Sequence, residues 1–179
     1  TLAEENGYIY ISTSADLVDL SNNCMIDSYS VGKTILLKND IDMKGVDFNP
    51  IGFMGGVFDG CGYKISGLRF EFSDPERGFI TTVGEQGVVK NLKIEAQIKE
   101  SSSKKEDTKL NIIDTITDSI KDGLPSELDR YTDSDGVYII GGICGINKGL
   151  IENCEFEGNI KASKAVGGIA GLNDKTGII

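Results

Sequence analysis

The sequence predicts an all-β solenoid, a fold in which short strands form stacked coils and each coil pairs in parallel with the next. Two repeats predict it. VVKNLKIEAQI at 88–98 returns as LIENCEFEGNI at 150–160, and GGICGIN at 141–147 returns as GGIAGLN at 167–173. A repeat of 20–30 residues made of short strands and glycine turns is typical of a solenoid, because a single coil cannot bury its own apolar face.

The two copies of the longer repeat alternate between apolar and polar residues, which is the period of a strand with one buried face. We therefore expect matching positions of the two copies to point inward together. These positions are Leu92, Ile94, Ala96 and Ile98 in the first copy, and Cys154, Phe156, Gly158 and Ile160 in the second.

Successive cycles open with a glycine, and five such glycines predict about five coils. They are Gly32, Gly62, Gly87, Gly149 and Gly177. The gap between Gly87 and Gly149 is more than twice the others, which predicts an insertion at 100–136. The chain is expected to be one domain over 1–179, with an amino-terminal cap at 1–31 and coils at 32–99 and 137–179. A β-sandwich of antiparallel hairpins is the alternative, although it would not require the same residues at the same points of a cycle.

Two segments outside the coils are predicted to be helical. SADLVDLS at 14–21 has Leu17 and Leu20 on one face and Thr13 or Ser14 as its cap, so it reads as a short amino-terminal capping helix. Within the insertion, helical spacing of isoleucines before Gly123 and Pro125 predicts an amphipathic helix. That helix either covers an edge of the coils or forms a recognition surface.

The repeats also assign roles to asparagine and cysteine. Asn91 recurs as Asn153 at a turn, where a left-handed backbone and a bond to the neighbouring coil are expected. Cys144 aligns with Ala170, and Cys154 aligns with Leu92, so both are predicted to be free thiols at interior positions.

Composition excludes several function classes. The net charge of −10 opposes binding to nucleic acid, and the absence of histidine removes His-based triads and imidazole zinc sites. No apolar run of 18 residues is present, so no membrane insertion of this segment is expected.

Acidic turns raise the question of a calcium site. The first set is Asp129, Asp133 and Asp135, and the second is Asp40, Asp42 and Asp47. The first set is not followed by the glutamate that completes an EF-hand loop, so it is predicted to be a polar turn. The second set is predicted to be a solvated turn. No metal and no cofactor are expected.

The strongest catalytic candidates are Glu95 and Glu157, which occupy equivalent outward positions of the two repeats. Paired carboxylates carry out acid–base chemistry in many sugar-cleaving enzymes. No aromatic platform accompanies them, and a charged, solvated face is the preferred interpretation. No catalytic residue is therefore predicted, and the chain is expected not to be an enzyme.

Several segments resemble the glycine-rich GLUG repeats of bacterial surface proteins and the amino-terminal solenoid of IgA1-specific metallopeptidases. They are VFDGCGYKISGLRF at 57–70, GVVKNLKIEAQI at 87–98, GGICGINKGLIENCEFEGNI at 141–160 and VGGIAGLN at 166–173, with LLKNDIDMKGVDFNPIG at 36–52 resembling the usual lead-in. The chain departs from this pattern at Cys61, where asparagine is expected, and at GFITTV, which lacks the double glycine. The resemblance implies a right-handed parallel β-helix and display outside the bacterial cell.

The expected function is a non-catalytic repeat module of a bacterial cell-surface or secreted protein, with an adhesion or spacer role and a host protein or glycan as partner. The alternatives are a substrate-positioning domain of a secreted peptidase, such as an IgA1-type metallopeptidase, and a carbohydrate-active β-helix. Because the last residues begin a new strand without a cap, the chain is expected to be a fragment with further domains after Ile179.

Overall fold

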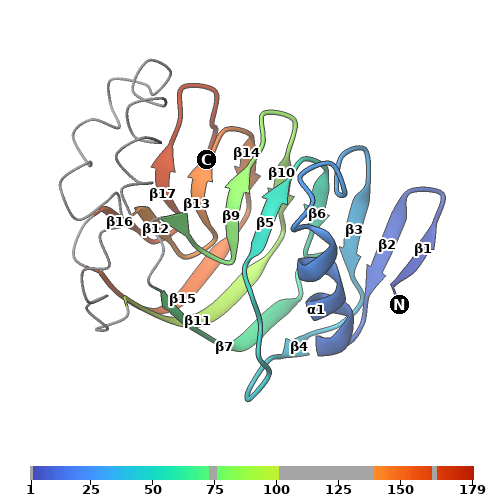
Figure 1. Cartoon of the computed structure of the whole chain (residues 1–179), viewed down its shortest axis with the longest axis horizontal. Coiled ribbons are helices and arrows are strands. Elements are labelled where there is room, and N and C mark those ends of the chain that lie inside the picture. Colours follow the sequence, from blue (N-terminus) through green and yellow to red (C-terminus); the bar gives the residue numbers. More distant parts are fainter. Residues whose placement is uncertain (1, 73–75, 101–138, 163–164) are drawn as a thin grey trace, which may run out of the picture.

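The computed structural model describes residues 2–72, 76–100, 139–162 and 165–179, and Figure 1 shows their strands together with one helix. The predicted insertion at 100–136, with its helix and the turn containing Asp129, Asp133 and Asp135, lies outside the described residues, apart from the backbone of Glu100 in a strand. The same holds for residues 137 and 138.

The largest sheet and the sheet with the longest strands each contain strands from both halves of the chain. The six-stranded sheet has, in order, β1 (Ala3–Glu5), β2 (Tyr8–Ile11), β3 (Thr34–Leu37), β6 (Val57–Asp59), β10 (Val88–Lys90) and β14 (Leu150–Glu152). A four-stranded sheet has β15 (Glu155–Lys161), β11 (Lys93–Glu100), β7 (Lys64–Phe72) and β4 (Ile41–Asp42).

The remaining described strands form two smaller sheets. A second four-stranded sheet has β17 (Ala170–Asn173), β13 (Cys144–Asn147), β9 (Ile80–Val83) and β5 (Ile51–Met54). A three-stranded sheet has β16 (Ala165–Gly167), β12 (Ile139–Gly141) and β8 (Glu76–Arg77).

The predicted pairing of the repeats is confirmed. β11 and β15 run parallel with Ile94 opposite Phe156, and β13 and β17 run parallel with Cys144 opposite Ala170. The segment at 36–52, which resembles the lead-in, also contributes a parallel strand, because its β4 pairs in parallel with β7. In Figure 1 the colours change in sequence order across neighbouring strands, as expected when later segments add beside earlier ones.

The predicted fold class, a right-handed parallel β-helix of about five coils, is wrong. The described strands form four separate sheets of unequal size, and the largest is mixed because β1 and β2 run antiparallel. The β8–β12–β16 sheet contains no strand from the first 72 residues. Sequence repetition specifies which strands pair and in what register. It does not specify how the separate sheets are joined, which depends on the turns between them.

The predicted amino-terminal helix is present as α1 (Ser14–Asn23). Thr13 is its N-cap, and its hydroxyl accepts a hydrogen bond from the Asp16 amide at 3.1 Å, while the Asp16 carboxylate accepts one from the Thr13 amide at 2.9 Å. This reciprocal capping box satisfies amides that would otherwise lack partners. Leu17 and Leu20 are fully buried, and α1 contacts β2 and β5.

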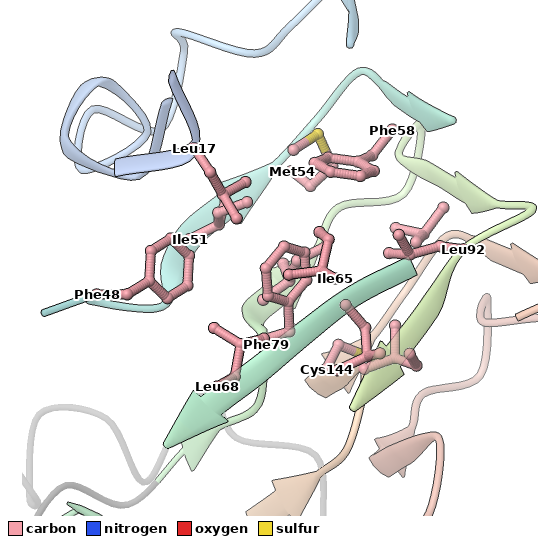
Figure 2. Packing of buried hydrophobic residues seen from close by; sticks show 14 of the residues in the cluster. Leu17, Phe48, Ile51, Met54, Phe58, Ile65, Leu68, Phe79, Leu92 and Cys144 are labelled. Carbon is pink, nitrogen blue, oxygen red and sulfur yellow. The ribbon is translucent and has the colours of Figure 1, made fainter. Parts of the chain in front are cut away.

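The inward side chains of the sheets form one apolar cluster, part of which is drawn in Figure 2. Phe79 lies in an aromatic group at its centre. Its ring stacks on Phe48 with centroids 5.7 Å apart, and it meets Phe58 edge-on at 5.8 Å. Leu92 and Ile94 are also buried, as the alternation predicts, and Phe156 is half-buried against the same cluster.

Two glycines show why the repeats contain this residue. A Cβ atom on Gly142 would collide with the Gly168 carbonyl and the Phe156 ring, because neighbouring strands approach closely at the repeated double glycine. Gly62 instead has φ +82°, a left-handed backbone that glycine adopts without strain. Glycine is thus required for close packing at Gly142 and for a positive φ at Gly62.

Candidate functional site

Asparagine and aspartate side chains form a hydrogen-bonded ladder at one set of turns. Asn153 donates to the Asn91 side-chain oxygen at 2.7 Å, and Asn91 donates to the Asp59 carboxylate at 3.0 Å. Asn91 and Asn153 have φ values of 50° and 49°, which confirms the left-handed turn predicted for both. Burial acts to raise the pKa of Asp59, but the hydrogen bonds from Asn91 and the Cys61 amide outweigh it and lower this pKa. The ladder holds adjacent turns in register.

A shallow pocket of about 320 Å³ lies beside this ladder. Its lining residues are Gly62, Asn91, Lys93, Asn153, Cys154 and Glu155. Lys93 and Glu155 form an ion pair at 3.5 Å, so the pocket's cation and its carboxylate already satisfy each other. Neither Glu95 nor Glu157 lines the pocket.

Glu95 and Glu157 lie side by side, as the repeat predicts, on the paired strands β11 and β15. The ammonium group of Lys64 on β7 contacts both carboxylates, at 3.5 Å in the case of Glu157. Its hydrogen bond with Glu95, followed by the charges of both glutamates, raises the pKa of Lys64. The three side chains form an exposed ion-pair network in which a cation compensates the two acids.

These residues belong to a broader surface that we call the polar face, the outward side of β7, β11 and β15. Its main side chains are Lys64, Glu71, Lys93, Glu95, Gln97, Lys99, Glu155, Glu157 and Asn159. Lys99 pairs with Glu71 at 3.7 Å, and Asn159 donates to Gln97 at 3.1 Å. Most charges and amides of the polar face therefore have a neighbour on the next strand.

A second surface was not predicted from the sequence. The outward side of the six-stranded sheet carries a line of in-register side chains, which we call the apolar row. Its members are Tyr8, Thr34, Val57, Val88 and Leu150, and Ile178 continues it through an isolated bridge. All are half-buried or exposed, and Tyr8 and Ile178 are 46% and 62% exposed. The signal in the sequence was the pairing of apolar neighbours, as in Val88-Val89 and Leu150-Ile151, where alternation predicts a polar outer residue.

Sequence reasoning also missed the role of the asparagine that ends each glycine motif. Asn147 is fully buried, and its side chain donates to Asn173 at 2.7 Å and to the Ile178 carbonyl at 3.1 Å. Its oxygen accepts from the Gly149 amide at 3.1 Å. The recurrence of GIN as GLN was the available signal for this structural ladder.

The turn containing Asp40 and Asp42 behaves as the predicted polar turn. Asp40 accepts from the Lys64 amide at 2.8 Å, and Asp42 accepts from the Lys44 amide at 2.9 Å. Within the described parts of the chain, no group of three or more cysteine and acidic residues is arranged to hold a metal ion.

All four cysteines are free thiols. Cys24 and Cys144 are fully buried, Cys154 is half-buried and Cys61 is exposed, which confirms the prediction for Cys144 and Cys154. Burial raises the pKa of Cys24 to about 11 and that of Cys144 to about 12, both from an ordinary value of 9.0.

These shifts predict that stability falls at alkaline pH. The unfolded chain releases the two thiol protons near pH 9.0, whereas the folded chain holds them until about pH 11 and 12. Between the pKa of the unfolded chain and that of the folded chain, each thiol should therefore lower the free energy of unfolding by about 1.4 kcal/mol per pH unit. Urea unfolding at several pH values measures this slope. Cys144→Ala, which installs the residue found at the paired position 170, should make it shallower, and an unchanged slope would contradict the assignment.

Comparison with models of known protein families, with curated proteins and with solved structures gives no match to this chain. The resemblance to GLUG repeats thus remains a prediction. Among the described residues, no helix has both the length and the apolar character needed to cross a bilayer.

Proposed function

We propose that this chain is a non-catalytic module of a bacterial cell-surface or secreted protein, and that it binds a host protein through the apolar row. The extracellular setting rests on the resemblance of the glycine motifs to GLUG repeats. The binding role rests on one observation, the line of outward side chains across the six-stranded sheet, which is apolar at every member except Thr34.

The apolar row has the extent of a recognition surface. Five neighbouring strands about 4.8 Å apart carry it over roughly 20 Å. Contiguous exposed apolar surface is uncommon on soluble proteins and often marks an interaction site. The polar face has less to gain from a partner, because binding there would separate or dehydrate charges that are already paired, such as Lys64 with Glu95 and Lys93 with Glu155.

The chemistry of the row favours a protein over a glycan. The hydroxyl groups of the row belong to Tyr8 and Thr34 at one end, whereas Val57, Val88 and Leu150 offer apolar contact area but no hydrogen-bonding groups. A sugar hydroxyl buried against these three residues would lose its partners in water. A protein surface with its own apolar centre and polar rim matches such a strip. The neighbouring ion pair between Asp59 and Lys90, at 3.7 Å, supplies a polar border.

The test is binding of the labelled chain to a panel of immobilised host extracellular-matrix proteins and, in parallel, to a glycan array. Val88→Lys places a charge in the middle of the row and should weaken binding to the retained matrix protein about tenfold or more. Gln97→Lys adds the same charge to the polar face and should leave binding unchanged. Circular dichroism verifies that both variants are folded.

Three results would overturn this proposal. If Val88→Lys and Gln97→Lys weakened binding equally, the apolar row would not be the binding surface. Retention only on the glycan array would replace the protein partner with a sugar. No retention on either array would favour a spacer role.

A further inference from the structure

The turn between β1 and β2 contains the only asparagine–glycine pair of the sequence, Asn6-Gly7. The two residues have φ values of 50° and 79°, as expected for the type I′ turn that joins antiparallel strands through two residues. The side chain of Asn6 is exposed to water. We propose that Asn6 is a site of spontaneous modification, at which water converts the side-chain amide into aspartate or isoaspartate and ammonia is released.

The reaction begins at the backbone nitrogen of Gly7, after this nitrogen has lost its proton to hydroxide. The nitrogen attacks the side-chain carbonyl carbon of Asn6, a carbon–nitrogen bond forms, and the amide nitrogen of the side chain takes a proton from water and leaves as ammonia. The product is a succinimide ring, which a water molecule then opens. Opening at the side-chain carbonyl gives aspartate, whereas opening at the backbone carbonyl gives isoaspartate, in which the main chain continues through Cβ.

The peptide between Asn6 and Gly7 is able to rotate into the geometry that this attack needs. In the part of the chain that the structure describes, neither the Gly7 nitrogen nor the Asn6 carbonyl forms a backbone hydrogen bond, and the Asn6 side chain has no hydrogen-bond partner. Rotation of this peptide gives a type II′ turn, in which ψ of the first central residue is about −120° and the following nitrogen approaches the asparagine side chain. Because a type II′ turn also joins paired strands, and glycine adopts either sign of φ, the attack does not require β1 to separate from β2.

Asn91 and Asn153 show that the backbone angle alone does not make such a site. Their φ values of 50° and 49° match that of Asn6. However, Asn153 donates to the Asn91 side chain, which itself donates to Asp59, and the Asn91 carbonyl accepts a hydrogen bond from the Gly62 amide at 2.8 Å. Leucine and cysteine follow these two asparagines, and their side chains crowd the attacking nitrogen. Both residues should therefore keep their side-chain amides.

Isoaspartate at position 6 would open the hairpin. It adds one carbon to the main chain of a two-residue turn, and only three residue pairs join β1 to β2. The ion pair between Glu4 and Lys33, at 3.1 Å, depends on the same pairing. Aspartate leaves the main chain unchanged and tolerates the left-handed backbone, so the hairpin should persist in that product. This inference does not depend on the proposed function, because it uses neither the apolar row nor a partner.

Incubation of the full 179-residue chain in mildly alkaline buffer at body temperature tests the proposal. Peptide mass spectrometry measures the conversion of each side-chain amide into an acid, and an isoaspartyl methyltransferase labels the isoaspartate. Asn6 should lose its amide about tenfold faster than Asn91 or Asn153, or more, because their hydrogen bonds must break first. The rate should rise with pH, since the attacking nitrogen is deprotonated. Asn6→Gln should stay unmodified at this position, because its longer side chain would have to close a larger ring.

Hydrogen exchange of the β1 amides distinguishes the two products. The amides should exchange freely in the isoaspartate fraction and remain protected in Asn6→Asp, the matched control with the same added charge. If Asn6 kept its amide in the folded chain while the urea-unfolded chain lost it, the fold would protect this site and the proposal would be overturned. Equal rates at Asn6, Asn91 and Asn153 would overturn it as well. Protected β1 amides in the isoaspartate fraction would overturn the predicted opening of the hairpin.

Discussion

Ile94→Asp is expected to unfold the protein. Ile94 is 1% exposed on the central strand β11, between Ile65 of β7 and Phe156 of β15. A carboxylate there would have no cation or hydrogen-bond donor in the apolar cluster, and burial of an unpaired charge costs more than most domains can tolerate. Far-ultraviolet circular dichroism at 25 °C should show loss of the native spectrum.

Gln97→Asp is the control for this prediction, because it introduces the same carboxylate three residues along β11 on the polar face. It should unfold at nearly the wild-type temperature. Wild-type thermal stability in Ile94→Asp would contradict the inward register of β11, and equal destabilisation by both variants would show that β11 cannot accept a new carboxylate on either face.

Phe79→Ala is expected to reduce the free energy of unfolding by about 3–5 kcal/mol. Phe79 is fully buried, and its ring contacts both Phe48 and Phe58, so its removal leaves a cavity and ends two aromatic contacts. Urea denaturation of the wild type and the variant measures the difference.

Tyr63→Ala provides the comparison for Phe79→Ala, because Tyr63 is an aromatic residue that is 38% exposed. Tyr63→Ala should reduce the free energy of unfolding by clearly less than Phe79→Ala does. If Phe79→Ala cost no more than Tyr63→Ala, the aromatic group would not be the centre of the core.

The sequence was most informative where it repeats. Alternation and recurrence together predicted that Ile94 lies beside Phe156 and that Cys144 lies beside Ala170, and both pairings are present. The physical reason is that strands in register place like residues next to each other, so a repeat in the sequence becomes a column in the structure. The capping box of α1 was equally local, since Thr13 and Asp16 are only three residues apart.

The global arrangement could not be predicted in the same way. Alternation predicts the buried face of a single strand, and recurrence predicts which two strands pair. The division into four sheets depends instead on turns of irregular length. The antiparallel β1–β2 hairpin has no counterpart in the repeats. Phe79 was also hard to place, because the degenerate motif GFITTVG preserves few of the residues that identify the other copies.

For the candidate sites too, contacts between the two repeats could be predicted from the sequence, whereas contacts that involve further strands could not. The juxtaposition of Glu95 and Glu157 followed from the repeat, but the position of Lys64 between them depends on a third strand, β7, whose register includes a bulge. The apolar row was missed because alternation was used to assign outward positions as polar. Val57, Val88 and Leu150 are outward and apolar, and only the alignment of three separate strands shows that they form one surface.

Parallel, in-register pairing of β11 with β15 underlies both the core and the polar face, and disulfide mapping tests it most directly. Gln97 and Asn159 lie opposite each other, with their side-chain amides hydrogen-bonded at 3.1 Å. Cysteines at both positions should cross-link within one chain on mild oxidation of a dilute sample, as mass spectrometry of the peptides would show. Cysteines at positions 97 and 161 are displaced by two residues and should not. A link in the displaced pair, or none in the matched pair, would contradict the register.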